Sequence, residues 1–201
     1  MTGRASVALL LLLFASLACG GTPTSFNAKQ DALVFSGYAW ALKDCGEQWV
    51  GPGPNLWSRD NVWVDEEGLH LKISYRNGQW YCAEAWTEID FGYGTYYFYL
   101  DARVDQLDPN VVFACFIYKD DLHEIDIEFS RWGDPSSLNA QYVVQPYYHA
   151  GNLHRFNVSL EGGPTTHVIE WAEGYVAFRS FLGHGHESSS SEHVLQEWNY
   201  T

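Results

Sequence analysis

The chain has 201 residues, of which 46% are hydrophobic and 16% are aromatic, so it is long enough for one domain with a sizeable core. Its formal net charge is -14, and an acidic surface repels phosphate backbones, which disfavours nucleic acid as a partner. The chain contains 9 Trp and 13 Tyr. Part of this aromatic content fills a β core, and the rest suits stacking against sugar rings, because Tyr and Trp combine an apolar face with a polar group.

Residues 1–18 have the pattern of an export signal. Arg4 supplies the positive charge, residues 7–14 form the apolar region, and Ser16-Leu17-Ala18 is a small-residue cleavage site. The apolar run is too short to span a membrane. Cys19 directly follows and suggests a bacterial lipoprotein whose N-terminal Cys carries lipid, although Ser16 stands where such proteins usually have Leu. We therefore expect an exported protein, either secreted or lipid-anchored on the bacterial cell envelope.

Three cysteines remain after Cys19, namely Cys45, Cys82 and Cys115, so at most one intramolecular disulfide can form and its pairing stays open. No Cys-x-x-Cys pattern exists, so a structural zinc site is not predicted. Residues 19–31 contain Gly, Pro, Thr and Asn without periodicity, which is typical of a linker or tail. The folded domain is therefore expected to span residues 32–201.

From residue 32 onward, short strand-like runs alternate with turn residues. The runs are 62–64, 69–75, 80–86, 95–104, 111–118, 123–132, 140–148, 154–160, 166–171, 175–182 and 194–200. Asn77-Gly78 is a hairpin signal between two of them. No window shows an apolar stripe at helical spacing longer than two turns. Many short strands without helices predict an all-β sandwich or barrel.

Residues 123–132 read His-Glu-Ile-Asp-Ile-Glu-Phe-Ser-Arg-Trp. Apolar and acidic side chains alternate in this stretch, the apolar ones being Ile125, Ile127 and Phe129 and the acidic ones Glu124, Asp126 and Glu128. A period of two is the signature of a half-buried strand, so the three carboxylates are expected to share the face opposite the core. Like charges stacked along one strand are destabilising. Paired carboxylates that perform acid/base and nucleophilic catalysis provide a reason for them.

This stretch resembles the catalytic signature of glycoside hydrolase family 16, Glu-[aliphatic]-Asp-[aliphatic]-Glu, in its uninterrupted form at residues 124–128. Residues 91–95 (Phe-Gly-Tyr-Gly-Thr) resemble the strand that precedes the motif in that family, and residues 166–171 (Thr-His-Val-Ile-Glu-Trp) resemble the strand that follows it. The resemblance covers about residues 35–200. It implies a concanavalin-like jelly-roll sandwich of two antiparallel sheets with a concave substrate cleft. The implied activity is endo-acting hydrolysis of β-glucan-type polysaccharides with retention of configuration.

By this resemblance, Glu124 is the nucleophile, Glu128 is the general acid/base, and Asp126 tunes their ionisation. Crowded carboxylates raise at least one pKa, which keeps an acid protonated near neutral pH. Residues i and i+4 on a flat strand lie about 13 Å apart at Cα, at about 3.3 Å per residue. Retention requires carboxyl groups about 5 to 5.5 Å apart, so the sheet must curve and the side chains must lean together.

Further substrate-binding candidates follow from the alternation of side chains. Trp132 continues the acidic face and is a candidate for stacking on a sugar, while Gln145 and Tyr147 share one face of a neighbouring strand and are candidates for hydrogen bonds to hydroxyl groups. For each of them the alternative is ordinary sheet packing or a solvated polar face. No cofactor is required. A structural calcium is common in the family, but no oxygen-ligand loop of recognisable spacing occurs here, and no metal ligands are predicted.

The expected partner is a polysaccharide, and the protein is expected to be a monomer. A transglycosylase of the same fold is an alternative, in which a sugar hydroxyl instead of water intercepts the glycosyl-enzyme. The alternative from a different class is a non-catalytic, carbohydrate-binding jelly-roll on a surface lipoprotein, against which the complete acidic trio argues. Family members normally continue for one or two strands beyond the position of Thr201, so a shortened sheet with an unpaired edge is also expected.

Overall fold

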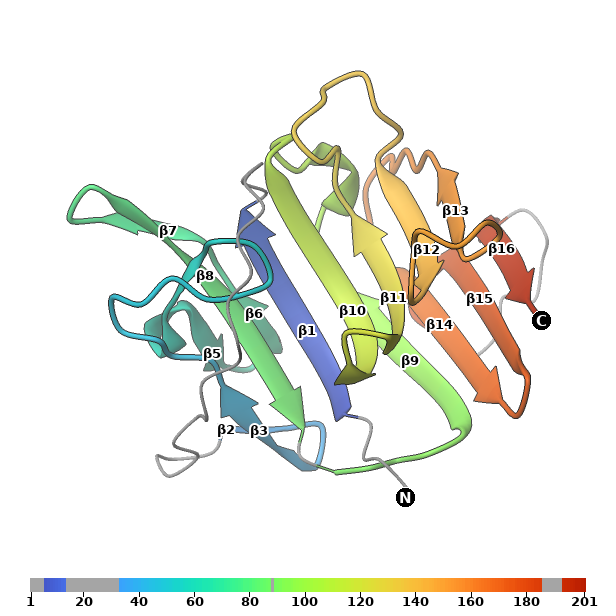
Figure 1. Ribbon diagram of the computed structural model, residues 1–201, viewed down its shortest axis with the longest axis horizontal. Coiled ribbons are helices and arrows are strands. Elements are labelled where there is room, and N and C mark those ends of the chain that lie inside the picture. Colours follow the sequence, from blue (N-terminus) through green and yellow to red (C-terminus); the bar gives the residue numbers. More distant parts are fainter. Residues whose placement is uncertain (1–5, 14–32, 88, 186–192) are drawn as a thin grey trace.

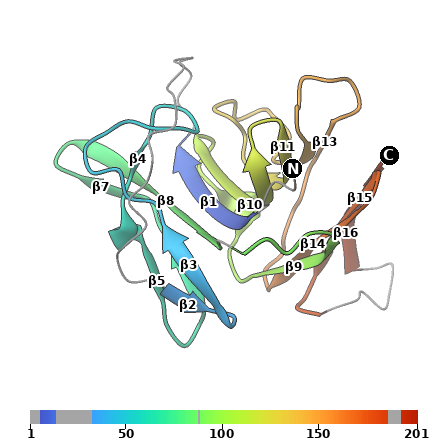
Figure 2. The same cartoon turned by 60° about the horizontal axis from the view of Figure 1, so that its bottom comes forward.

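The computed structural model describes residues 6–13, 33–87, 89–185 and 193–201, with side chains from residue 33 onward. Strands dominate the described chain, and its helical elements are two short 3-10 turns, η1 (Arg59–Asn61) and η2 (Val104–Gln106). Two packed antiparallel sheets form the body of the molecule (Figures 1 and 2). This confirms the all-β sandwich predicted from the strand pattern.

The larger sheet carries the acidic strand. Its order is β13 (Leu153–Phe156), β12 (Ala140–Val144), β11 (His123–Phe129), β10 (Val111–Asp120), β1 (Ser6–Leu13), β8 (Gln79–Thr87), β3 (Tyr38–Leu42) and β2 (Leu33–Phe35). Two more strands pair with β8, namely β4 (Leu56–Trp57), which runs parallel to it, and the antiparallel β7 (Ser74–Arg76). The acidic strand β11 therefore lies inside the sheet, between β10 and β12.

The smaller sheet covers one face of the larger one. Its order is β16 (Val194–Tyr200), β15 (Tyr175–Leu182), β14 (Thr165–Ala172) and β9 (Gly94–Leu100), and a separate hairpin joins β5 (Val62–Val64) to β6 (Leu69–Leu71). Figure 2 shows β9, β14 and β15 on one side of β10 and β11. The core lies between the sheets, where Tyr142 stacks on Phe178 with ring centroids 4.9 Å apart. The Tyr142 hydroxyl donates a hydrogen bond to Ser180 of the opposite sheet, at 2.7 Å.

Local turn chemistry accounts for one predicted connection. Asn77 and Gly78 both have positive φ, 52° and 80°, and join β7 to β8. Two consecutive residues with positive φ are what a two-residue hairpin of the favoured twist requires, which is why Asn-Gly predicts it.

Several predicted strands were too long. The run 69–75 divides into β6 and β7, and the run 95–104 ends at Leu100 before η2. The run 140–148 ends at Val144, shortly before Pro146, which has no backbone N–H to continue a ladder. The run 154–160 ends at Phe156. Apolar composition continues past these ends because the following residues still face the core, as Val158 and Leu160 do.

Strand β1 lies within the segment that the sequence marks as an export signal. Its backbone pairs with β10 along residues 6–13 and with β8 along residues 8–11. A short continuous apolar run suits both the apolar region of an export signal and a strand buried on both faces, so composition does not separate the two. The predicted domain, residues 32–201, excludes this strand, whereas the large sheet includes it. Cys19 and the predicted linker, residues 19–31, lie outside the described residues.

In the part of the chain that the structure describes, no helix has the length and apolar character needed to cross a membrane.

Among the described residues, Cys45, Cys82 and Cys115 form no disulfide with one another, and the Cys82 thiol donates a hydrogen bond to Asn55 Oδ1 at 3.6 Å. Cys82 lies on β8 and Cys115 on β10, and β1 runs between those strands. Strands two places apart are separated by about 9.5 Å, whereas a disulfide requires Cα atoms within about 7 Å. The sheet order therefore prevents this pair from forming the one disulfide that the sequence allows.

Candidate active site

Strand β11 presents its three acidic side chains on the face of the large sheet opposite the small sheet; we call this the carboxylate face. Alternation places them there because Ile127 and Phe129, between and beyond them, are fully buried in the core. The neighbouring strand β10 places Ala114, Phe116 and Tyr118 directly opposite Glu128, Asp126 and Glu124, in that order. The structure thus brings together the three carboxylates that the sequence predicts to share one face.

Asp126, the central carboxyl, is the most buried of the three, with 2% of its surface exposed. Its Oδ2 has no hydrogen-bond partner among the described residues. Burial raises its pKa well above the ordinary value, and the nearby charges of Glu124 and Glu128 raise it further. The raised pKa favours the protonated form of Asp126, which donates a hydrogen bond to Glu124, while the hydrogen bond from the Gln145 side chain opposes the rise.

Glu124 is affected by the same burial. Desolvation raises its pKa from 4.5 to about 7, opposed by the hydrogen bond from Asp126 and reinforced by the negative charges of Glu128, Asp121 and Glu84. A protonated Asp126 that donates to Glu124 favours the ionised form of Glu124. The ionisation of each of these two carboxyls therefore depends on that of the other.

Glu128 is held by a different set of partners. Gln141, directly opposite on β12, donates a hydrogen bond from Nε2 to Glu128 Oε2. Burial raises the pKa of Glu128, whereas the hydrogen bond from Gln141 and the positive charge of Arg155 lower it. Like the other two carboxyls, Glu128 is thus an acid with a raised pKa, but it has a neutral donor fixed at its oxygen.

Trp132 lies beside this group in an unusual backbone conformation. Its φ is +47°, a region that bulky residues rarely adopt and that costs about 1 to 3 kcal/mol. Its backbone N–H donates to Ser130 Oγ at 2.9 Å, and the guanidinium of Arg155 lies over its ring at 4.1 Å from the centroid. Strand β11 ends at Phe129, so the alternation used to predict the direction of Trp132 does not reach it. A left-handed turn places the ring at the carboxylate face instead.

An apolar cluster rich in aromatic residues lies on the same face as the carboxylates, and of its aromatic members the sequence singled out only Trp132. Its buried members include Trp57 and Phe116, and Trp86, Tyr118 and Trp132 pack against it. These residues come from β4, β8, β10 and the turn after β11. The alternation within β10 suggests such a set, because Phe116 and Tyr118 share one parity, but only the sheet order shows which aromatic residues from other strands join them.

Glu84 adds a fourth carboxyl, half-buried, to this face, and the sequence did not single it out. Register places Glu84 of β8 and Glu128 of β11 in one transverse row, through residue 10 of β1 and Ala114 of β10. Lys43 Nζ lies 2.5 Å from Glu84 Oε2 and donates to the Gly51 carbonyl at 2.8 Å. Burial raises the pKa of Glu84, and the positive charge of Lys43 opposes that rise. A single acidic residue in the otherwise apolar run of β8 was the available signal.

The two candidates beyond β12 have different surroundings. Gln145 hydrogen-bonds Asp126, and its Oε1 accepts from the backbone N–H of Tyr147 at 2.9 Å. Tyr147 itself is 60% exposed and packs edge-on against Tyr148. Gln145 therefore belongs to the carboxylate group, whereas Tyr147 lies in an exposed turn after the strand.

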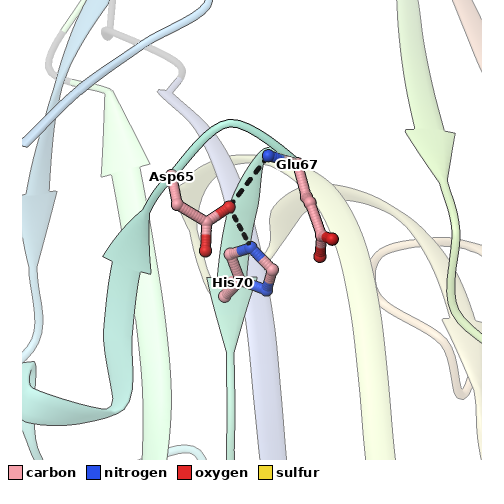
Figure 3. A group of neighbouring side chains, drawn as sticks. All are labelled: Asp65, Glu67 and His70. Atoms are coloured by element: carbon pink, nitrogen blue, oxygen red, sulfur yellow. Dashed lines mark hydrogen bonds and ion pairs between the residues drawn. The ribbon is translucent and has the colours of Figure 1, made fainter.

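A separate acidic group lies on the β5–β6 hairpin. In the part of the chain that the structure describes, the residues grouped closely enough to hold a metal are Asp65, Glu67 and His70 (Figure 3). Asp65 Oδ1 accepts the Glu67 backbone N–H at 2.9 Å and lies 2.7 Å from His70 Nε2. The Trp63 ring stacks on His70 with centroids 4.7 Å apart. A hydrogen bond between Asp65 and His70, with an aromatic ring stacked on the imidazole, accounts for this arrangement without a metal.

No family model matches the chain, and neither a curated protein nor a solved structure matches it. The function is therefore argued from the motif and the geometry of the carboxylate face.

Proposed function

We propose that the protein is an exported, retaining endo-glycoside hydrolase of β-glucan-type polysaccharides, similar to glycoside hydrolase family 16. The observation that carries this proposal is the row of three carboxyls on one face of β11, the central one buried and the outer two half-buried, all with raised pKa values. A structural role does not explain the row, because Asp126 is buried with an unpartnered oxygen beside two other acids, an arrangement that destabilises the fold. A pair of acids with separate environments is what glycoside hydrolysis requires.

In the proposed reaction, ionised Glu124 attacks the anomeric carbon and forms a glycosyl-enzyme. Protonated Glu128 transfers its proton to the departing glycosidic oxygen as that bond breaks. Water then attacks the glycosyl-enzyme, Glu128 takes up its proton, and Glu124 leaves as a carboxylate. Asp126 keeps its own proton throughout and donates a hydrogen bond to Glu124, which stabilises the anionic form both before attack and after release.

Retention requires the two glutamate carboxyls to approach each other across one strand face. The charge of Glu128 contributes to the raised pKa of Glu124, so the two groups act on each other. Cα atoms four residues apart on a flat strand are about 13 Å apart, so each long side chain must lean toward the other.

The surroundings favour a neutral sugar chain. Two partly exposed rings beside the carboxylates, Trp86 and Trp132, are flat apolar surfaces of the kind against which sugar rings stack. The net charge of -14 repels polyanionic polysaccharides. A β-glucan combines both requirements, since it is uncharged and its rings have apolar faces.

The test is release of reducing sugar from laminarin, mixed-linkage glucan, xyloglucan, agarose and carrageenan, with the anomeric configuration of the first product followed by NMR. We expect cleavage of a neutral β-glucan with retention. Glu124→Gln and Glu128→Gln should each reduce kcat at least about a thousandfold. Glu161→Gln is the matched control, because Glu161 is exposed.

Two results would contradict the proposal. Binding of one of these polysaccharides without cleavage would favour the carbohydrate-binding alternative. Wild-type rates in both Glu→Gln variants would show that the carboxylates have other roles. Transfer of the glycosyl group to an added oligosaccharide, in preference to water, would instead identify a transglycosylase. Export and lipidation at Cys19 are tested separately, by the intact mass of the protein recovered from its native envelope.

A further inference from the structure

Three residues form a transverse row across neighbouring strands of the large sheet. Glu128 of β11 lies opposite Gln141 of β12, which lies opposite Arg155 of β13. Gln141 donates from Nε2 to Glu128 and accepts at Oε1 from Arg155 Nε, at 2.8 Å. Gln141 is 6% exposed, so its amide has little access to water and both ends of it depend on these partners.

Arg155 also contacts the residue held in a strained conformation. Its guanidinium lies 4.1 Å from the centroid of the Trp132 ring, the distance of a cation–π contact. A strained conformation persists only where the surrounding contacts enforce it. One side chain, Arg155, thus bonds to the amide that orients Glu128 and covers the ring of Trp132.

We propose that Arg155 is a positioning residue that holds the acid/base carboxyl of Glu128, through Gln141, and the sugar-stacking ring of Trp132 in a fixed relative position. This inference rests on the proposed hydrolase function. Arg155 touches neither the anomeric carbon nor the departing oxygen in this scheme. Arg155 acts through the Gln141 amide. Its Nε–H donates to the amide oxygen, which fixes the direction of the amide and keeps Nε2 of Gln141 pointed at Glu128.

The positive charge of Arg155 also affects the ionisation of Glu128. The groups that face Glu128 along β11 are Asp126 and Glu124, and the groups across the sheet on β8 are Glu84 and its partner Lys43. From β13, the positive charge of Arg155 acts on Glu128 and lowers its pKa against the effect of burial. Removal of that charge should therefore raise the pKa of Glu128 and move the alkaline limb of the pH–rate profile to higher pH.

The experiment compares Arg155→Met, Arg155→Lys and Gln141→Leu in the full chain. Arg179→Met is the matched control, since Arg179 is a half-exposed arginine of the smaller sheet that pairs with Glu197 on the neighbouring strand. The measurements are kcat and KM against pH on the glucan that the wild type cleaves, and titration of Glu128 by NMR of isotope-labelled glutamate carboxyls. Circular dichroism and thermal unfolding check that each variant is folded.

We expect Arg155→Met to lower kcat/KM on the order of tenfold, because misplaced catalytic groups lose orientation, and to raise the pKa of Glu128. Arg155→Lys keeps the charge but lacks the planar fork, so it should keep the titration of Glu128 near that of the wild type while KM rises. Gln141→Leu should raise the pKa of Glu128 even if Arg155→Met does not fold. Arg179→Met should change neither quantity.

An unchanged Glu128 titration and unchanged kcat/KM in folded Arg155→Met would overturn the inference. So would equal effects of Arg155→Met and Arg179→Met. If the wild type cleaves no polysaccharide but Arg155→Met still shifts the Glu128 titration, the proposed hydrolase function fails while the coupling of Arg155 to Glu128 is supported.

Discussion

Replacement of Glu124 by Gln should make the protein inactive and, at neutral pH, more stable. Burial raises the pKa of Glu124 from 4.5 to about 7, so the folded protein retains a proton that the unfolded chain releases as pH rises. Where the folded state binds more protons, the free energy of unfolding falls as pH increases. For Glu124 this loss begins above pH 4.5 and is complete near pH 7.

The magnitude follows from the size of the shift. A rise from 4.5 to about 7 corresponds to at most about 3.5 kcal/mol, at about 1.4 kcal/mol per pKa unit, and partial exposure of Glu124 to water reduces it. Gln has nearly the same shape, keeps an oxygen that accepts from Asp126, and does not titrate. The stability difference between Glu124→Gln and the wild type should therefore be small at pH 4.5 and reach about 1 to 3 kcal/mol at pH 7.5.

The assay is urea unfolding at pH 4.5, 6 and 7.5, followed by intrinsic Trp fluorescence, for the wild type, Glu124→Gln and the exposed control Glu161→Gln. The control should follow the wild type at every pH. A stability difference that stays constant across this range would refute the argument, because it would mean that Glu124 titrates alike in the folded and unfolded states.

Other predictions concern the buried His167, strand β1 and the stacking of Trp132 on a sugar. Burial lowers the pKa of His167 from 6.5 to about 3, so the free energy of unfolding of the wild type should fall as pH decreases from 6.5 towards 3. In urea unfolding at pH 6.5, 5 and 4, the free energy of unfolding of His167→Gln should depend less on pH. Leu9 pairs with Cys115, so Leu9→Cys in the full chain should form a disulfide with it under mild oxidation, detected by peptide mass mapping, whereas Leu10→Cys, opposite Ala114, should not. Trp132→Ala should raise KM for a glucan by about tenfold and change kcat less, because the lost ring stacks on the sugar and takes no part in bond cleavage. Steady-state kinetics measure both constants, and a fall in kcat alone would contradict the sugar-stacking role of Trp132.

The alternation in residues 123–129 was enough to predict the strand and the shared face of its carboxylates, because side-chain direction along a strand depends only on the local backbone. The Asn77-Gly78 hairpin was predictable for the same reason, since its positive φ angles depend on the two residues themselves. The all-β class followed from many such local patterns. Strand ends were less predictable, because core contacts continue beyond the last ladder hydrogen bond.

Cross-strand register decided the rest, and no local pattern encodes it. Gln141 and Arg155 act on Glu128 because three strands align in one row, and Glu84 enters the same row across β1 and β10. The placement of residues 6–13 between β8 and β10 likewise depends on backbone pairing with distant strands, since their composition suits an export signal equally well. The sequence by itself determined which residues carry the acids and which face they share. The tertiary structure decided which amide, cation and aromatic rings surround them, because those neighbours come from segments far apart in the chain.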